Sequence, residues 1–403
     1  MKFNMKCLLT VFVLVFLISF FIRDGYSGEP RGVTKDTIKI GLMFSQTGPA
    51  AESGIPYAAA AKNYFRYIND AGGIHGRKVN LLIEDDRYSI PIAIAAFKKF
   101  VFKDKIMALL AVGGSAPATA LFKSIQKEKM PSLPISNAES MIKPHKSYMF
   151  ITGPTYSVDM EVILDYLMND LPIKKPRIAY VYPDNQLGHQ CLKPLEARAK
   201  KYGIELADKE VVNFGAMEAT TQVLHIKRAK IDYIVMSGIG QTGNVFLREL
   251  RKFRLSIPVY GYYGMTTEQL VEVAGEAARN YNGVNAFCSW YEDTPGIKIM
   301  RKITKKYKTS EDRLFRSRLY TIGWVGAMIF AEGMKRAGRN LDGEALINAI
   351  ESFRDFDSRG ITGPITYGKN KHYGNEHTKV YKANVEKKIL EPVTGWRKPL
   401  ELK

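Results

Sequence analysis

The chain has 403 residues, 25% of them charged, and a formal net charge of +19 at pH 7. This length exceeds one typical hydrophobic core and predicts two domains. The basic residues are dispersed along the chain with no arginine-rich tail, so we expect a solvated basic surface and no nucleic-acid partner. The six histidines and three cysteines show neither HExxH nor Cys-x-x-Cys spacing, which argues against the usual metal sites.

Residues 1–27 have the pattern of a cleavable secretory signal peptide. Lys2 and Lys6 precede an apolar core from Leu8 to Ile22, and small residues follow up to Ser27. The core is shorter than the roughly 20 residues that a membrane-spanning helix needs, and an uncleaved anchor is the alternative. We therefore expect the mature chain to be exported.

Two cysteines, Cys191 and Cys288, remain after the predicted cleavage. An oxidising compartment would permit a disulfide between them. Two unpaired buried thiols fit the sequence equally well. The sequence leaves this choice open.

After Thr34, short apolar runs alternate with amphipathic stretches. The predicted strands cover residues 37–44, 78–85, 106–112 and 130–136, and the predicted helices cover 55–70, 92–102 and 116–127. Such alternation is typical of βαβ units on a parallel sheet.

The same alternation begins again after residue 157. Predicted strands at 176–183, 203–212, 231–238 and 257–263 alternate with predicted helices at 187–202, 218–230, 243–253 and 266–277. The sequence therefore predicts an α/β protein with two doubly wound lobes. Two longer helices at 296–308 and 318–337, a turn-rich segment and a final strand at 379–389 complete the chain.

The loops that follow the predicted strands are the expected place for a ligand, because ligands of open α/β sheets bind at the carboxyl ends of the strands. Most of these loops are rich in Ser, Thr, Asn and Gly. Such residues leave backbone N–H groups exposed at helix N-termini, which favour carboxylate or phosphate. Ordinary helix capping is the alternative for each loop.

No cofactor is expected. The stretch Gly238 to Gly243, "GIGQTG", matches the dinucleotide fingerprint in a strand–helix context, but the next strand ends in Gly261, Tyr262 and Tyr263 where an acidic residue is required. Gly48 and Gly54 lack the lysine and hydroxyl residue of a phosphate loop.

The sequence gives little support for an enzyme. No G-x-S-x-G elbow stands on a strand-to-helix turn. Asp85 and Asp86 are paired carboxylates at the end of a predicted strand, and we expect them to anchor the loop before Pro91 rather than to catalyse a reaction.

Five motifs in order, from about Thr37 to Tyr367, carry a family resemblance. They are "IKIGLMFSQTGPAAESG", "YINDAGGIHGRKVNLLIEDD", "MPSLPISNAES", "YMFITGPT" and "GITGPITYG". Together they resemble the leucine/isoleucine/valine-binding protein family, the type I periplasmic receptors of branched-chain amino acid ABC importers. The resemblance implies a periplasmic, monomeric binding protein that closes over a small ligand and delivers it to an inner-membrane permease.

The resemblance also implies two Rossmann-like lobes joined by three crossings near Gly153, Phe287 and Ile365. The first lobe would consist of residues 36–153 and 287–363, and the second of residues 154–286 and 364–403. The ligand cleft would lie between them.

In the first lobe, the family's ligand contacts come from the loops after strands one, three and four. The residues at these positions are Ser45, Gln46, Ser53, Gly114, Ser115, Ser136 and Asn137. In the family the last two loops hold a carboxylate with hydroxyls and backbone N–H groups. Asn137 stands where Ser or Thr is usual, and its amide can still donate a hydrogen bond.

The second lobe departs from the family pattern. Tyr262 and Tyr263 stand where amino-acid binders of the family carry an acid for the ligand ammonium, and the aromatic residue usual near Gly240 is absent. Tyrosine hydroxyls, ring faces or Asp184 are candidate substitutes, and Tyr156 is a candidate wall of the cleft.

The resulting hypothesis is a non-enzymatic solute receptor for a branched-chain type amino acid or a related small carboxylate or amide. One alternative is an extracellular sensor domain of the same fold, which we expect to carry a transmembrane helix and a signalling module after Lys403. A secreted α/β enzyme is the other alternative.

Overall fold

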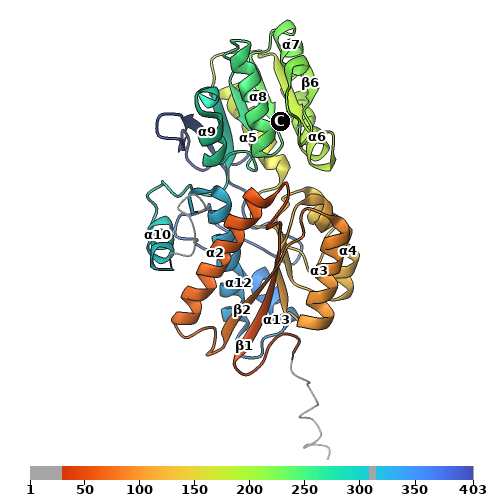
Figure 1. Ribbon diagram of the computed structural model, residues 1–403, viewed down its shortest axis with the longest axis vertical. Coiled ribbons are helices and arrows are strands. Elements are labelled where there is room, and N and C mark those ends of the chain that lie inside the picture. The colour runs from red at the N-terminus through yellow and green to blue at the C-terminus, as the bar shows by residue number, and fades with distance from the viewer. Residues whose placement is uncertain (1–29, 308–314, 403) are drawn as a thin grey trace, which may run out of the picture.

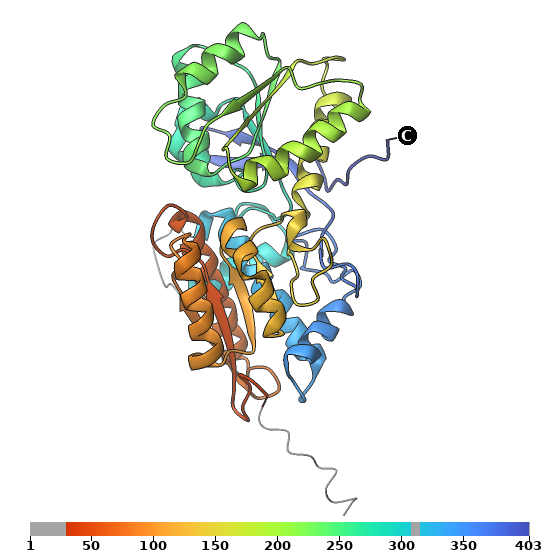
Figure 2. The ribbon, with the colours of Figure 1, turned by 90° about the vertical axis from the view of Figure 1, so that its right-hand side faces the viewer.

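The computed structural model describes residues 30–307 and 315–402, so the predicted signal peptide lies outside the described residues. Two lobes lie one above the other, each built from a sheet with helices packed against it (Figures 1 and 2). None of the helices in the described ranges has the length and apolar character needed to span a membrane.

The first lobe contains a parallel sheet with strand order β2-β1-β3-β4. Its strands are β1 (Thr37–Met43), β2 (Lys78–Glu84), β3 (Ala108–Val112) and β4 (Ser132–Pro134). The connecting helices are α2 (Ala51–Asp70), α3 (Ile90–Lys98), which continues as the π-helix η1 (Lys99–Asp104), and α4 (Ser115–Lys127). Because helices cover both faces of this sheet, β3 is buried along its whole length and reads as a continuous apolar run.

Later helices of the described residues complete the first lobe: α10 (Pro295–Tyr307), α12 (Arg318–Ala337) and α13 (Gly343–Glu351). Helix α12 packs closely on α2, since a Cβ at Gly323 would lie 2.4 Å from the carbonyl oxygen of Tyr57. The sequence predicted α12 over the same residues, whereas α13 was not predicted.

The second lobe contains a seven-stranded sheet of order β11-β10-β9-β8-β7-β5-β6. Its strands are β5 (Ile178–Tyr182), β6 (Asp208–Val211), β7 (Tyr233–Met236), β8 (Val259–Gly261), β9 (Tyr281–Asn285), β10 (Lys379–Asn384) and β11 (Ile389–Pro392). Strands β5 to β9 are parallel, and β10 and β11 add antiparallel pairs. The helices are α5 (Tyr156–Asn169), α6 (Gln186–Lys201), α7 (Thr220–Arg228), α8 (Gly240–Lys252) and α9 (Glu268–Ala274), with the short 3-10 helix η3 (Gly275–Ala278). The 3-10 helix η2 (Glu139–Met141) contacts α4 and belongs to the first lobe.

Strand β9 was not predicted, because its sequence "YNGVN" lacks an apolar run. All five residues are nevertheless buried, since β9 lies between β8 and β10. Helix α5 was also missing from the prediction.

Within the described residues, the chain passes between the lobes three times: after β4, after β9 and after α13. Isolated bridges join the crossing segments, with Ile151 paired to Tyr373 and Phe287 paired to Thr362. The residue boundaries given for the lobes above stay a prediction.

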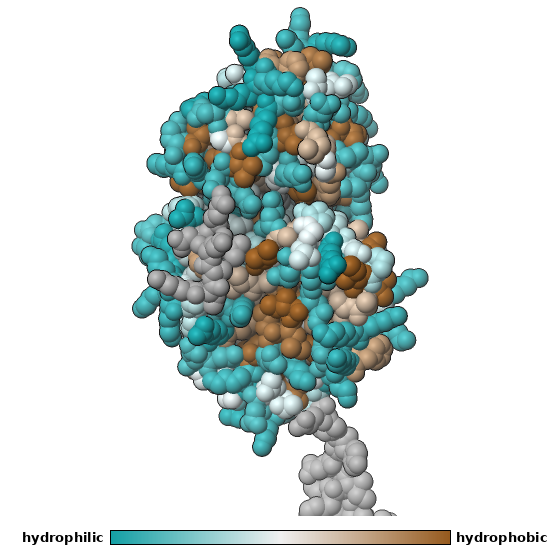
Figure 3. Space-filling model, viewed as in Figure 1, coloured by the Kyte–Doolittle hydropathy of each residue, from teal (hydrophilic) through white to brown (hydrophobic). Residues whose placement is uncertain are grey.

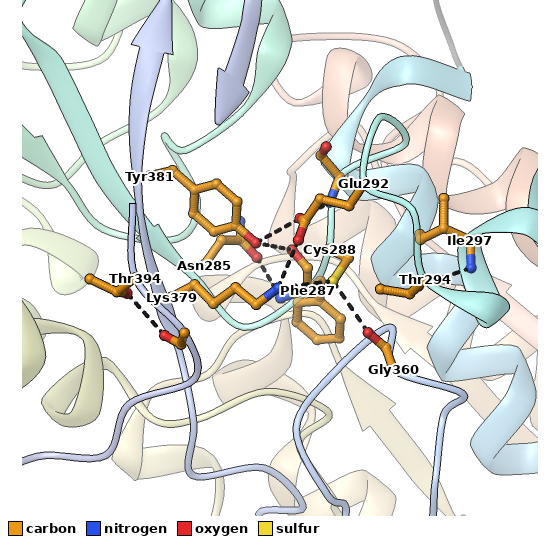
Figure 4. A network of polar contacts seen from close by, with 12 residues as sticks. Asn285, Phe287, Cys288, Glu292, Thr294, Ile297, Gly360, Lys379, Tyr381 and Thr394 are labelled. Atoms are coloured by element: carbon orange, nitrogen blue, oxygen red, sulfur yellow. Dashed lines mark hydrogen bonds and ion pairs between the residues drawn. The ribbon is translucent and has the colours of Figure 1, made fainter. Parts of the chain in front are cut away.

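A polar network fixes the second crossing to β10 (Figure 4). The Nζ atom of Lys379 lies 2.7 Å from a carboxylate oxygen of Glu292, and the Tyr381 hydroxyl donates to Glu292 over 2.9 Å. Cys288 lies in the same network and donates to the carbonyl of Gly360 over 3.3 Å. Cys288 and Cys191 are both free and buried, so the two thiols do not form the disulfide that the sequence permitted.

The surface shown in Figure 3 is mostly hydrophilic, with smaller apolar patches on both lobes. This agrees with the solvated surface expected from the dispersed charges.

Candidate ligand-binding site

A cavity of about 100 Å³ lies between the lobes, where the carboxyl ends of strands from both sheets meet. It is lined by Phe44, Pro49, Ala50, Ser53, Tyr88, Gly114, Ser115, Ile135, Ser136, Tyr156, Leu187, Phe214, Ile239, Tyr262, Tyr263, Gly264 and Leu319. No charged side chain belongs to this lining, as far as the described residues go. The cavity is thus aromatic and apolar, with a small number of hydroxyl groups.

Three hydroxyls meet on one side of the cavity. The Ser115 Oγ atom lies 2.8 Å from Ser136 Oγ and 3.3 Å from the hydroxyl of Tyr156, and Ser136 Oγ lies 3.2 Å from the same tyrosine. Ser115 is the first residue of α4, Ser136 follows β4, and Tyr156 is the first residue of α5. These groups can donate hydrogen bonds to an oxygen-rich ligand group.

The N-terminus of α4 adds to this polar side. No side chain caps α4, which is 13 residues long. Its first N–H groups therefore remain available, and a helix N-terminus favours a negative group. The preceding Gly114 has φ +69°, and a Cβ there would come within 2.2 Å of the Tyr88 ring. This position therefore requires glycine.

Tyr88 is held in an uncommon backbone conformation beside the cavity, with φ +57°. Asp86 accepts hydrogen bonds from the Tyr88 N–H over 3.0 Å and from the Ser45 hydroxyl over 2.6 Å. Asp85 accepts from the Gln46 N–H over 2.8 Å and from the Thr47 hydroxyl over 2.6 Å. Asp85 also accepts from the Arg87 N–H over 3.0 Å. Both carboxyl groups thus hold the loop before Pro91, as the sequence predicted, and they join it to the loop after β1.

Tyrosines form the wall on the side of the second lobe. The ring of Tyr156 stacks on that of Tyr263 with centroids 6.1 Å apart, and Tyr262 meets Tyr156 edge-on at 5.7 Å. Burial raises the pKa of all three hydroxyls above the ordinary value, so these tyrosines stay neutral hydrogen-bonding groups.

An acidic group lies behind this wall. Asp159, on α5, is fully buried, and its Oδ2 accepts a hydrogen bond from the Tyr263 N–H over 3.2 Å. Burial raises its pKa well above the usual range, although the bond from Tyr263 acts in the opposite direction and Glu139 adds to the rise. Its Oδ1 has no hydrogen-bond partner among the described residues.

Of the residues proposed from the sequence, those that line the cavity are Ser53, Gly114, Ser115, Ser136, Tyr156, Tyr262 and Tyr263. They come from five separate segments of the chain. The loops after parallel strands therefore converge, as the sequence argument required.

The other proposed residues lie outside the cavity lining. Ser45 is fully buried against Asp86, and the Gln46 side chain donates to the carbonyl of Phe44 over 2.9 Å. Asn137 packs against the first crossing, since a Cβ at Gly153 would lie 2.6 Å from its Nδ2.

Asp184 and Gly240 also lie elsewhere. The Asp184 carboxylate is 62% exposed and pairs with the His189 Nε2 over 2.8 Å. Gly240 begins α8 and faces the first lobe, because a Cβ there would come within 2.8 Å of a Glu52 carboxylate oxygen.

Several lining residues were missed by the sequence analysis, among them Phe44, Tyr88, Phe214 and Leu319. Phe44 and Tyr88 belong to the loops after the first two strands, where the rule for open α/β sheets would have found them. Leu319 lies on α12, and nothing in its local pattern distinguishes it from a core leucine.

Direct hydrogen bonds join the lobes beside the cavity. The Gln186 side chain on α6 donates to the Thr119 hydroxyl on α4 over 3.2 Å, and Gln190 donates to the Ser140 hydroxyl over 2.9 Å. The Tyr263 hydroxyl donates to the Ile135 carbonyl over 3.0 Å. The structure is therefore a form in which the two lobes touch.

Comparisons with known proteins agree over most of the chain. The sequence model of a family described as "Periplasmic binding protein" matches residues 37–388. A leucine-, isoleucine-, valine-, threonine- and alanine-binding protein of Pseudomonas aeruginosa is 22% identical over 327 residues, which cover 79% of this chain and 83% of that protein.

Two solved structures are similar in fold. A branched-chain amino acid ABC transporter protein from Thermus thermophilus, with bound valine, has a TM-score of 0.83 at 22% identity and covers 91% of this chain and 97% of its own. A fatty acid ABC transporter substrate-binding protein from Thermomonospora curvata has a TM-score of 0.83 at 24% identity and covers 93% and 95%. At these identities the likeness shows the fold, and it confirms the predicted type I periplasmic binding protein fold.

Proposed function

Because the chain belongs to the periplasmic binding protein family, as the match over residues 37–388 shows, we propose that it is the substrate-binding protein of an ABC importer and holds a small carboxylate between its lobes. The family consists of binding proteins rather than enzymes, which confirms the expectation that this chain catalyses no reaction. An inner-membrane permease as partner and a periplasmic location after signal cleavage form part of the proposal.

The main support for this proposal is the polar side of the cavity. Ser115, Ser136 and Tyr156 place three hydroxyls within 3.3 Å of one another, beside the uncapped N-terminus of α4. A carboxylate there would accept hydrogen bonds from hydroxyls and from backbone N–H groups without needing a basic side chain. Gly114, Ser53, Tyr262 and Tyr263 would contact the rest of the ligand, while Ser45, Gln46, Asn137, Asp184 and Gly240 would support the cleft from outside it.

The rest of the lining favours an apolar ligand body. Aromatic and aliphatic side chains surround the hydroxyls, and the volume of about 100 Å³ is small beside the roughly 300–1,000 Å³ of typical ligand pockets. The ligand should therefore be short.

Two classes of ligand come into consideration: α-amino acids, and carboxylates or amides without an amino group. The similar proteins named above include binders of branched-chain amino acids and a fatty acid binder. An α-amino acid brings an ammonium group that requires a carboxylate or several acceptors. Since no acid lines the cavity among the described residues, the lining favours carboxylates or amides without an amino group.

A thermal-shift screen tests the proposal. The mature chain would be heated with L-valine, L-isoleucine, hexanoate, phenylacetate and hexanamide, each at millimolar concentration. A ligand present at 100 times its Kd stabilises the native state by about 2.7 kcal/mol, which raises the melting temperature by several degrees. If no compound raises it, the carboxylate assignment fails; if only the two amino acids do, the preference for amino-free ligands is wrong.

A further inference from the structure

Tyr263 connects the two lobes. It follows β8 of the second lobe, and its hydroxyl donates to the carbonyl of Ile135, which directly follows β4 of the first lobe. The same side chain lines the cavity and stacks on Tyr156. One residue thus joins the lobes and also forms a wall of the ligand space.

The backbone of Tyr263 is held on both sides by buried side chains. Asp159 accepts a hydrogen bond from its N–H over 3.2 Å, and the Asn285 amide on β9 donates to its carbonyl over 3.1 Å. Asp159 and Asn285 are both fully buried. The turn after β8 is therefore fixed by side chains from α5 and β9.

An aspartate that holds this turn from a buried position lowers the stability of the protein. Among the described residues no cation acts on the carboxyl group of Asp159, and its Oδ1 has no hydrogen-bond partner there. A buried carboxyl without a cation costs stability relative to an apolar residue. The bond from the Tyr263 N–H is the hydrogen bond that the Asp159 side chain accepts among the described residues.

We propose that Asp159 is a positioning residue that fixes the turn carrying Tyr263, so that this tyrosine joins the lobes and limits the length of the ligand. This inference rests on the proposed function for the part that concerns the ligand. The part that concerns Tyr263 and lobe closure can be measured without any ligand.

Hydrogen exchange of the ligand-free mature chain tests the first part. The readout is the backbone N–H of Tyr263, in a peptide that covers residues 259–267. Asp159→Leu and Asp159→Ala remove the acceptor, and we expect exchange at Tyr263 to become at least about tenfold faster. Asp159→Asn keeps an acceptor oxygen, so its exchange should stay near that of the unaltered protein. Unchanged exchange in the Leu and Ala variants would overturn the proposal.

Small-angle scattering of the same proteins tests the link to closure. Tyr263→Phe removes only the hydroxyl that reaches Ile135, and it should shift the lobes toward a more open form. Asp159→Leu should produce the same shift, and the double variant should open no further than either single variant. Additive shifts would mean that Asp159 acts independently of Tyr263, which contradicts the proposal.

Ligand length supplies the last readout, with hexanoate and dodecanoate as probes. We expect Asp159→Leu and Tyr263→Ala to lower the ratio of hexanoate to dodecanoate affinity by about tenfold or more, because the wall is displaced. An unchanged ratio would overturn the length-limiting role.

If neither fatty acid binds the unaltered protein, the proposed ligand class fails, and the exchange and scattering results decide the positioning role. Should Asp159→Leu and Asp159→Ala not fold, Asp159→Val, which has nearly the shape of aspartate but no acceptor, replaces them: faster exchange at Tyr263 supports the role, and unchanged exchange refutes it.

Discussion

The hydroxyls of Ser115 and Ser136 lie 2.8 Å apart, although the two residues follow different strands of the first sheet. Neighbouring parallel strands end at the same edge, and this brings the two loops together. The pair forms the centre of the proposed carboxylate site.

Removal of either hydroxyl should weaken carboxylate binding. A hydrogen bond to a charged group contributes about 1.5–3 kcal/mol, so Ser115→Ala or Ser136→Ala should raise the Kd roughly tenfold to a hundredfold for any carboxylate that the screen identifies. Isothermal titration calorimetry measures this. Ser124→Ala, on the same helix as Ser115 but outside the cavity, is the control and should leave the Kd unchanged.

The close approach of α2 to the first loop leads to a second prediction. A Cβ at Gly54 would lie 1.8 Å from the Ser45 carbonyl oxygen, a backbone atom that cannot move alone. Gly54→Ala should therefore displace this loop and lower the free energy of unfolding by about 1–3 kcal/mol, measured by urea denaturation. Gly395→Ala meets no atom within 4 Å and should change it by less than about 0.5 kcal/mol. Equal effects of the two substitutions would contradict the packing argument.

A third prediction concerns the buried charge between the lobes. Arg318, on α12, is fully buried and donates to Glu268 on α9 over 2.8 Å and to the Phe287 carbonyl over 2.6 Å. Although burial opposes its charge, Glu268 and the neighbouring acidic groups hold the pKa of Arg318 above its ordinary value. Arg318→Met would leave Glu268 without its cation and should cost about 3–5 kcal/mol of stability.

Chemical denaturation of this variant provides the measurement, and an exposed ion pair provides the control. The Lys298 and Asp293 side chains are 59% and 71% exposed, so Lys298→Met should cost less than about 1 kcal/mol. If Arg318→Met were as mild as this control, the buried pair would not stabilise the contact between the lobes.

The repeating strand–helix pattern made most of the fold predictable. The apolar runs at β1, β3 and β5 were identified because buried parallel strands are apolar along their length. Strand β9 was not predicted because it contains asparagine and glycine. It is a strand because it pairs with β10, which is distant in the sequence. Such a tertiary pairing has no local signal.

The cleft was predictable to the level of loops but not of side-chain directions. Ser115 and Ser136 face the cavity, whereas the adjacent Asn137 turns toward Gly153 at the first crossing. The sequence alone does not distinguish neighbouring positions of an irregular loop, because no periodicity applies there. Asp159 was missed for another reason, since its helix, α5, was not predicted and no buried face was assigned to this carboxyl.

The pKa of Asp159 leads to the final prediction. Burial raises this pKa well above the usual range, so the native state keeps a proton that the unfolded chain loses above about pH 4. The stabilisation is complete below the unfolded pKa and is lost as the pH rises toward the folded pKa. Relative to the unaltered protein, Asp159→Asn should therefore gain up to about 1.4 kcal/mol of stability per pH unit as the pH rises from the unfolded pKa toward the raised folded pKa. Glu139, Cys191 and Tyr263 face this carboxyl and are unchanged in the variant.

Urea denaturation at several pH values measures the difference. For Asp184→Asn, at an exposed site, the stability should change with pH as it does in the unaltered protein. The same result for Asp159→Asn would show that Asp159 is ionised in the native state.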